Sequence, residues 1–457
     1  MTSALTSLLL ATLTIYYGRV NADTSPRPRC PIMCSCRGRG VFCSHTFMTD
    51  VPQLPVNTEN ILLRKNNISR IRANAFSEVH KLTELTLQYN NIRSLDGRAF
   101  EGLSLLRTFT LIENSVVFES GVFRFFYNVS LLSLQVKYIH VPQREICMLK
   151  QLQQLTLGTF EFPYVKFDDC FEGLQKLKVL TLYDMKQSNI SRATFRPFRY
   201  SLTELNIRKC GIRSLDVDTF KDLSKLNVLS LTENAITYLP STIFMPLTSL
   251  THLYIAEDKL KVIPDGLLSP LRYLENLFIS GVSPMKLTIG EDFINMTRLQ
   301  QIVFRGIKKP SLDNTTFRHL RHCPITSLKL AMCSIQTISR GALMPFRNLS
   351  SFNLYSNPLN GSVLHDALYG LQGSQLRSLY LSGLYLRDYP TALFEGLKDN
   401  NITTLVMNTS RITVIKNGLF RNLGAVSSLD LRSNHITTLE DQSFKDLVVL
   451  STLIIDG

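Results

Sequence analysis

Residues 226–236 read Leu-Asn-Val-Leu-Ser-Leu-Thr-Glu-Asn-Ala-Ile, with aliphatic residues at positions one, four, six and eleven and asparagine at position nine. The alternation of Leu229 and Leu231 is typical of a short β-strand with one buried face. Copies of this pattern begin at Thr58, Leu82, Leu106, Val129, Leu152, Leu177, Leu202, Leu226, Leu250, Leu274, Leu299, Ile325, Leu349, Leu376, Ile402, Val426 and Leu450, 23 to 27 residues apart. One copy cannot bury its apolar face alone, so the sequence predicts a solenoid of stacked copies whose strands pair in parallel.

The asparagine at position nine is expected to turn the chain and to bond the backbone of the neighbouring copy. Cys210 and Cys333 occupy this position, where we expect small buried thiols. Other copies replace the asparagine with Lys137, Phe160, Met185, Asp258, Val282, Ile307, Leu384 or Ser410. A phenylalanine farther along many copies, such as Phe100 or Phe220, is expected to pack behind the sheet as a structural residue.

Residues 1–22 are typical of an export signal. An apolar run from Leu5 to Tyr17 precedes the small-residue pattern Val20-Asn21-Ala22, and the run is too short to span a membrane. Four cysteines follow as C-x3-C-x-C-x6-C, namely Cys30, Cys34, Cys36 and Cys43. In an oxidising compartment this cluster indicates a disulfide knot. A zinc site is the alternative, but no His-x-His pattern or second cysteine pair lies nearby.

Asn-x-Ser/Thr sequences, which accept N-linked glycans in exported proteins, support this assignment. They occur at Asn67, Asn128, Asn189, Asn295, Asn314, Asn348, Asn360, Asn401 and Asn408. Asn408 falls on an outward position of its strand, so a glycan there would obstruct the concave face. We therefore expect a binding surface in the first two-thirds of the array.

The repeated pattern and the opening Cys30-Pro31 resemble the extracellular leucine-rich-repeat family over residues 30–457. The resemblance implies an α/β horseshoe with short parallel strands on its concave face, a cysteine-rich cap at residues 23–57, and about 17 repeats over 58–457. It further implies the disulfides Cys30–Cys36 and Cys34–Cys43, and a cap that shields the first sheet edge. The long array with broken asparagine positions resembles the ectodomain of Toll-like receptors. Such receptors continue into a second cysteine cap, a membrane helix and a signalling domain, so we interpret the chain as a fragment.

Two further cysteines, Cys147 and Cys170, lie at similar positions in successive copies, so we predict a disulfide between them. Two free buried thiols are the alternative. Cys323 has no evident partner and is expected to be a buried free thiol.

The composition favours binding over catalysis. The eight histidines are scattered, and no motif for nucleophilic catalysis, metal binding or phosphate binding occurs. We therefore expect no enzyme activity, cofactor or metal. The net charge of +14 suggests a polyanionic ligand or, alternatively, only a solvated basic exterior, because no dense Lys/Arg run occurs. The net charge therefore admits nucleic acid as a ligand, but the sequence has no basic cluster that would support this interpretation.

Exposed strand positions carry the candidate ligand contacts, because aromatic and arginine side chains dominate binding hot spots. The candidates are Tyr183, Tyr254, Phe278, Arg305, Tyr355 and Tyr380. The alternative is that they are ordinary exposed side chains of a sheet face. The concave positions also carry acids, namely Glu84, Glu113, Glu204, Glu233 and Glu257.

The sequence thus predicts a ligand-recognition ectodomain of a Toll-like innate immune receptor, in which a protein or microbial ligand brings two copies or two different receptors together. Its location would be the cell surface or the endosomal lumen. The alternatives are a secreted or cell-surface adhesion or guidance protein and a soluble truncated decoy.

Overall fold

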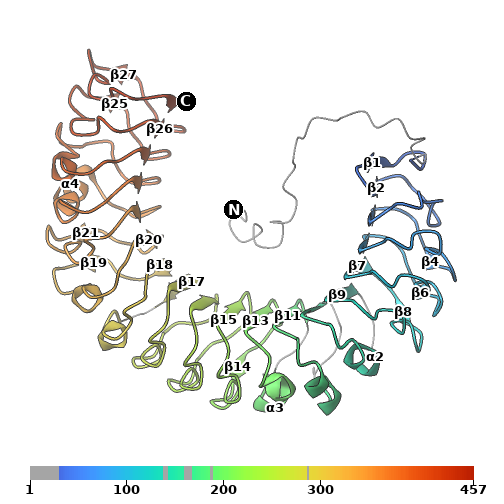
Figure 1. Cartoon of the computed structure of the whole chain (residues 1–457). Helices are drawn as coiled ribbons and strands as arrows, with labels where there is room; N and C mark the ends of the chain where they lie inside the picture. Colours follow the sequence, from blue (N-terminus) through green and yellow to red (C-terminus); the bar gives the residue numbers. More distant parts are fainter. Residues whose placement is uncertain (1–29, 137–142, 159–166, 186–188, 286–287, 457) are drawn as a thin grey trace.

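A computed structural model describes residues 30–136, 143–158, 167–185, 189–285 and 288–456. The expected signal peptide, the first residues of the expected cap, Lys137 and Phe160 lie outside the described residues. The chain forms a curved solenoid whose strands line the inner edge of the arc, while short helices lie on its outer edge (Figure 1). The expected leucine-rich-repeat horseshoe with an N-terminal cysteine cap is confirmed.

The concave face is one sheet of 19 strands within the described residues. Except for the antiparallel pair β1–β2, each strand pairs in parallel with the strand of the next copy, as in β15–β16 and β16–β17. The strands are β1 (Ser35–Arg37), β2 (Gly40–Ser44), β3 (Asn60–Arg64), β5 (Glu84–Gln88), β7 (Thr108–Asn114), β9 (Leu131–Val136), β10 (Gln154–Gly158), β11 (Val179–Tyr183), β13 (Glu204–Arg208), β15 (Val228–Thr232), β16 (His252–Ala256), β17 (Asn276–Met285), β18 (Gln301–Ile307), β20 (Ser327–Ala331), β22 (Ser351–Asn353), β23 (Ser378–Tyr380), β24 (Thr404–Val406), β26 (Ser428–Asp430) and β28 (Thr452–Ile454). One strand of this sheet falls in each expected copy.

The outer side of the solenoid consists of two-residue strands, short helices and turns. The short strands are β4 (Arg70–Ile71), β6 (Ser94–Leu95), β8 (Val117–Phe118), β12 (Asn189–Ile190), β14 (Ser214–Leu215), β19 (Ser311–Leu312), β21 (Thr337–Ile338), β25 (Val414–Ile415) and β27 (Thr438–Leu439). The helices are α2 (Gln143–Cys147), α3 (Arg192–Phe195), α4 (Gly361–Tyr369), η1 (Asp169–Gly173), η2 (Arg196–Phe198), η3 (Glu291–Phe293), η4 (Arg318–Leu320) and η5 (Glu395–Leu397). No described helix is long and apolar enough to cross a membrane.

The core between the two sides is filled by the repeated aliphatic residues and by phenylalanines. Phe76 stacks on Phe100 with ring centroids 6.1 Å apart, and Phe220 on Phe244 at 6.5 Å. All four side chains are buried. The phenylalanines therefore bridge successive copies behind the sheet, as their spacing predicts.

The asparagine at position nine links neighbouring copies through backbone hydrogen bonds. Asn90 donates from Nδ2 to the carbonyl oxygen of Leu63 at 2.9 Å and accepts from the amide of Asn66 at 3.1 Å. Cys210 takes the place of the donating asparagine, because its thiol donates to the carbonyl oxygen of Leu182, which lies 3.4 Å from Sγ. Ser410 does the same toward Leu381 at 2.8 Å. Cys210 and Ser410 can therefore donate to the preceding copy as asparagine does, whereas the buried Met185 and Leu384 at this position cannot.

One assignment at this position is wrong. The repeat pattern predicts Asp258 there and places Glu257 on the exposed concave face, whereas Asp258 is exposed and Glu257 is 0 % exposed. Glu257 accepts hydrogen bonds from the amides of Asn234 at 3.2 Å and Ile236 at 3.3 Å. The glutamate side chain is longer than that of asparagine, so Glu257 at position eight reaches the buried amides that an asparagine at position nine would otherwise bond.

Strands β17 and β18 interrupt the regular stacking. Their register shifts between Ser280 and Met285, where β17 runs on past the usual strand length. Gly306 has a φ of +69°, and a Cβ atom there would lie 1.9 Å from the carbonyl oxygen of Gly281. Only glycine permits this close approach.

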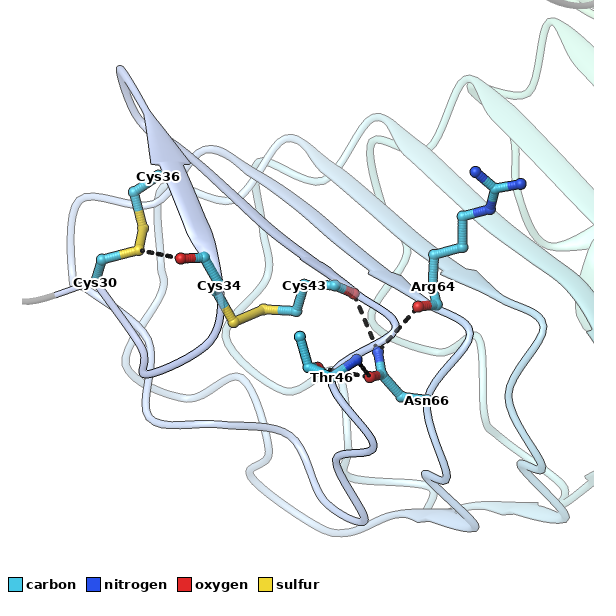
Figure 2. The surroundings of a disulfide bond; sticks show 7 residues. All are labelled: Cys30, Cys34, Cys36, Cys43, Thr46, Arg64 and Asn66. Carbon is cyan, nitrogen blue, oxygen red and sulfur yellow. Dashed lines mark hydrogen bonds between the residues drawn. A yellow bond between two sulfur atoms is a disulfide. The ribbon is translucent and has the colours of Figure 1, made fainter.

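The N-terminal cap is held by disulfides Cys30–Cys36 and Cys34–Cys43, the expected pairs (Figure 2). Strand β2 pairs in parallel with β3 and antiparallel with β1, so the cap adds two strands to the sheet. Asn66 donates from Nδ2 to the carbonyl oxygen of Cys43 at 3.0 Å, which ties the cap to the first copy.

Cys147 and Cys170 form the third disulfide, which joins α2 to η1 on the outer side. Cys210, Cys323 and Cys333 are free and buried. Burial raises the pKa of each of these three thiols to about 11, so they are protonated at neutral pH.

Candidate ligand-binding face

The middle residue of each regular concave strand projects toward solvent, and strand register aligns these residues in a row that we call the central column. From β5 to β15 the column holds only short polar side chains, namely Thr86, Thr110, Ser133, Thr156, Thr181, Asn206 and Ser230. Such side chains make the central column polar from β5 to β15, whereas Leu62 of β3 and Phe42 of β2 precede them in the same row.

The central column changes abruptly at β16, where Ser230 is followed by Tyr254 and then by Phe278 on β17. Both side chains are half-buried, and their ring centroids lie 6.3 Å apart. The column continues with Val303 and Lys329. Tyr254 and Phe278 therefore form an aromatic pair near the middle of the array, of the kind that anchors ligands at interfaces.

His252 lies beside this pair and is held by hydrogen bonds on both ring nitrogens. Its ring stacks on that of Tyr254 with centroids 6.4 Å apart. Asn276 Nδ2 lies 2.8 Å from His252 Nε2, and Thr251 Oγ1 lies 2.9 Å from Nδ1. Thr251 Oγ1 itself donates to the carbonyl oxygen of Asn227 at 3.0 Å. The aromatic pair thus has a fixed polar neighbour.

Glu257 is buried one residue beyond the same strand. Burial, opposed by hydrogen bonds from Asn234 and Ile236, raises the pKa of its carboxyl group to about 7. Burial also raises the pKa of the half-buried Tyr254, with a further contribution from the charge of Glu204. The repeat beneath the aromatic pair is therefore sensitive to pH in the neutral range.

Tyr183 belongs to a separate network on β11 and β13. The guanidinium group of Arg208 lies 5.7 Å from the centre of its ring and pairs with Glu233 at 2.7 Å. Strands β13 and β15 separate it from Tyr254. The structure therefore does not bring Tyr183 to the aromatic pair.

Three other candidates lie beyond β17. Arg305 is exposed on β18, one strand after Phe278, and aligns with Ser280 beside the central column. Tyr380 occupies the central column of β23, and Tyr355 follows β22. Both tyrosines are half-buried, and other strands separate them from the aromatic pair.

The sequence could have revealed the aromatic pair, because Tyr254 and Phe278 both occupy position five of successive copies. Sequence reasoning missed His252 and Asn276, which occupy position three of the same copies and bond each other across the strands. Comparison of equal positions in neighbouring copies would have exposed this pair of residues as well.

The glycosylation candidates mostly lie on the outer surface. Asn67, Asn128, Asn295, Asn314, Asn348, Asn360 and Asn401 are exposed. Asn408 is half-buried, and its Nδ2 donates to Asp430 at 3.2 Å. Asn189 begins β12, and its side chain lies outside the described residues. Attachment of glycans at these sites stays a prediction.

The described residues contain no group of three or more His, Cys, Asp or Glu side chains arranged to hold a metal ion. The concave face offers aromatic, hydroxyl and basic groups on a rigid sheet, which is an arrangement suited to binding.

Comparison with known proteins agrees with the repeat architecture. Residues 56–116, 200–260 and 400–457 match the family model described as leucine rich repeat. Opticin from Bos taurus is 38 % identical over 195 residues, which are 43 % of this chain and 51 % of opticin. Podocan from Mus musculus is 25 % identical over 443 residues, 94 % of this chain and 61 % of podocan. The chain therefore spans about half to three-fifths of the length of these relatives.

Among solved structures, the complex of TLR13 with ssRNA13 is similar over 93 % of this chain and 67 % of the matched chain, with a TM-score of 0.63 and 19 % identity. This likeness concerns the fold alone. The chain thus has the leucine-rich-repeat horseshoe fold with a disulfide-bonded N-terminal cap, and three parts of it match the leucine-rich-repeat family model.

Proposed function

We propose that this chain is the ligand-recognition ectodomain of a Toll-like receptor and that ligands bind on its concave face around Tyr254 and Phe278. The observation that carries the proposal is the aromatic pair itself, which interrupts a column of short polar side chains. Aromatic side chains with little rotational freedom bury much area at low entropic cost, so they suit a recognition surface.

The extent of the array supports the receptor assignment. The likeness to the TLR13 structure runs over 93 % of this chain, although it shows only a shared fold. Ligand-induced pairing of two ectodomains, at the cell surface or in the endosomal lumen, is part of this proposal. No catalytic step or cofactor is included.

A second candidate function is that of a secreted or cell-surface matrix or adhesion protein. The sequence relatives opticin and podocan favour it, and podocan is similar over 94 % of this chain. In this case the concave face would bind a protein partner without immune signalling. A soluble decoy remains a variant of the receptor proposal.

Sequencing the transcript beyond the codon for Gly457 separates these candidates. A second cysteine-rich cap, about 20 consecutive apolar residues and a cytoplasmic domain would support the receptor. A reading frame that closes without a spanning segment would contradict the membrane receptor and favour the secreted protein or the decoy.

The proposed face is tested with short single-stranded RNA, the class of ligand named in the TLR13 complex. Binding is measured by fluorescence anisotropy at two salt concentrations, because phosphate contacts weaken steeply with salt. Replacing Tyr254, Phe278 and Tyr380 together with alanine should abolish binding, whereas Tyr238→Ala, at a tyrosine that is 61 % exposed, should leave it unchanged. A salt-independent signal, or no signal, would exclude nucleic acid as the ligand.

A further inference from the structure

A hollow on the outer side of the solenoid lies between the turn that begins at Arg340 and the end of helix α4. Its volume is about 550 Å³, which is within the usual range of small-molecule sites. Two arginines, three glycines and Tyr369 contribute to its wall, with Met344 and Gln372. The hollow is distant in sequence from Tyr254 and Phe278, and the proposed function does not use it.

Glycines bring the two sides of the hollow together. A Cβ atom at Gly370, which is buried, would lie 2.9 Å from the carbonyl oxygen of Arg340, so glycine allows the end of α4 to approach this turn closely. Gly373 has a φ of +71°, and a Cβ atom there would meet nothing within 4 Å, so the space beside it is open.

Arg340 is held against an aromatic ring, and both arginines of the hollow are exposed. The guanidinium group of Arg340 lies 3.8 Å from the centre of the Tyr369 ring, and the Tyr369 hydroxyl donates to Glu395 at 2.9 Å. A guanidinium group stacked on a ring keeps its N–H edge free for an acceptor. Among the described residues, neither Arg340 nor Arg347 takes part in an ion pair.

We propose that this hollow binds an acidic saccharide, with its sulfate or carboxylate group held by Arg340 and Arg347. Arginine recognises such oxyanions through paired N–H donors. Met344, whose side chain is 53 % exposed, offers an apolar surface for the C–H face of a sugar ring.

The test is isothermal titration of the whole chain with a sulfated heparin-derived disaccharide and with the same disaccharide after desulfation. We expect one site per chain and binding at least about tenfold weaker without sulfate, as expected for the loss of a charged hydrogen bond. Arg340→Gln and Arg347→Gln should each weaken binding about tenfold or more. The matched control is Arg272→Gln, because Arg272 is exposed and, like Arg347, lies two residues before the first leucine of a copy.

Four results would overturn the proposal. The first is a double variant, Arg340→Gln with Arg347→Gln, that remains folded by circular dichroism and binds as tightly as the unmodified chain. The second is an affinity for inorganic phosphate, measured by competition, that equals the affinity for the sulfated disaccharide, since the hollow would then hold any small anion. The third is binding that appears only in Asn348→Gln, because the hollow would then be occupied by a glycan of the chain itself. The fourth is that the chain binds neither disaccharide, whether Asn348 is intact or replaced.

Discussion

Replacing Glu257 with glutamine is expected to change how the stability of the solenoid depends on pH. The carboxyl group of Glu257 is 0 % exposed, and burial raises its pKa from 4.5 to about 7. Because the folded chain holds this proton more tightly than the unfolded chain, folding is favoured when the group is protonated. The resulting stabilisation is complete below about pH 4.5 and is lost as the pH rises through about 7.

The size of the effect follows from the pKa. A change from 4.5 to about 7 corresponds to about 3 kcal/mol, at about 1.4 kcal/mol for each pH unit. Glutamine stays neutral, but its single carbonyl oxygen can replace only one of the two carboxylate oxygens that accept from the amides of Asn234 and Ile236. The variant should therefore be less stable than the unmodified chain at pH 4.5 by the lost hydrogen bond, and this difference should shift in favour of the variant by up to about 3 kcal/mol between pH 4.5 and pH 8.

Unfolding by urea is followed by circular dichroism between pH 4.5 and 8, because the chain has no tryptophan to report by fluorescence. Hydrogen exchange at the amides of Asn234 and Ile236 gives the local response. Glu84→Gln, at an exposed carboxyl on β5, is the control and should leave the pH profile unchanged. Parallel pH profiles for the unmodified chain and Glu257→Gln would refute the reasoning.

Three further predictions concern the repeat and its thiols. Asn90→Ala should lower the free energy of unfolding by about 1–3 kcal/mol in urea titrations, since it leaves the carbonyl oxygen of Leu63 without its donor, whereas Asn91→Ala at the adjacent exposed position should cost little. Phe220→Ala should cost about 3–5 kcal/mol in the same titrations, because it removes a buried ring stacked on the next copy; a loss below about 1 kcal/mol would contradict a structural role. The free thiols of Cys210, Cys323 and Cys333 should resist a water-soluble disulfide reagent at pH 8 until urea unfolds the chain, because burial holds the pKa of each at about 11. Rapid labelling of the folded chain would count against their burial.

The sequence by itself determined the architecture. Each copy carries its own alternating aliphatic residues and its own turn, so the period alone specifies parallel strands stacked along one axis. The cap pairs Cys30–Cys36 and Cys34–Cys43 and the pair Cys147–Cys170 also followed from local spacing or family resemblance. These features depend on residues within one copy or in adjacent copies.

Only the tertiary structure decided how the aligned side chains of neighbouring copies contact each other. It gives the ring contact of Tyr254 with Phe278, the hydrogen bond of His252 with Asn276 and the cation–π contact of Arg208 with Tyr183. It also buried Glu257 in place of Asp258, because a difference of one residue in where the chain turns decides whether a side chain faces solvent or the next copy. Such contacts depend on the register and bend between copies of unequal length, which no single copy encodes.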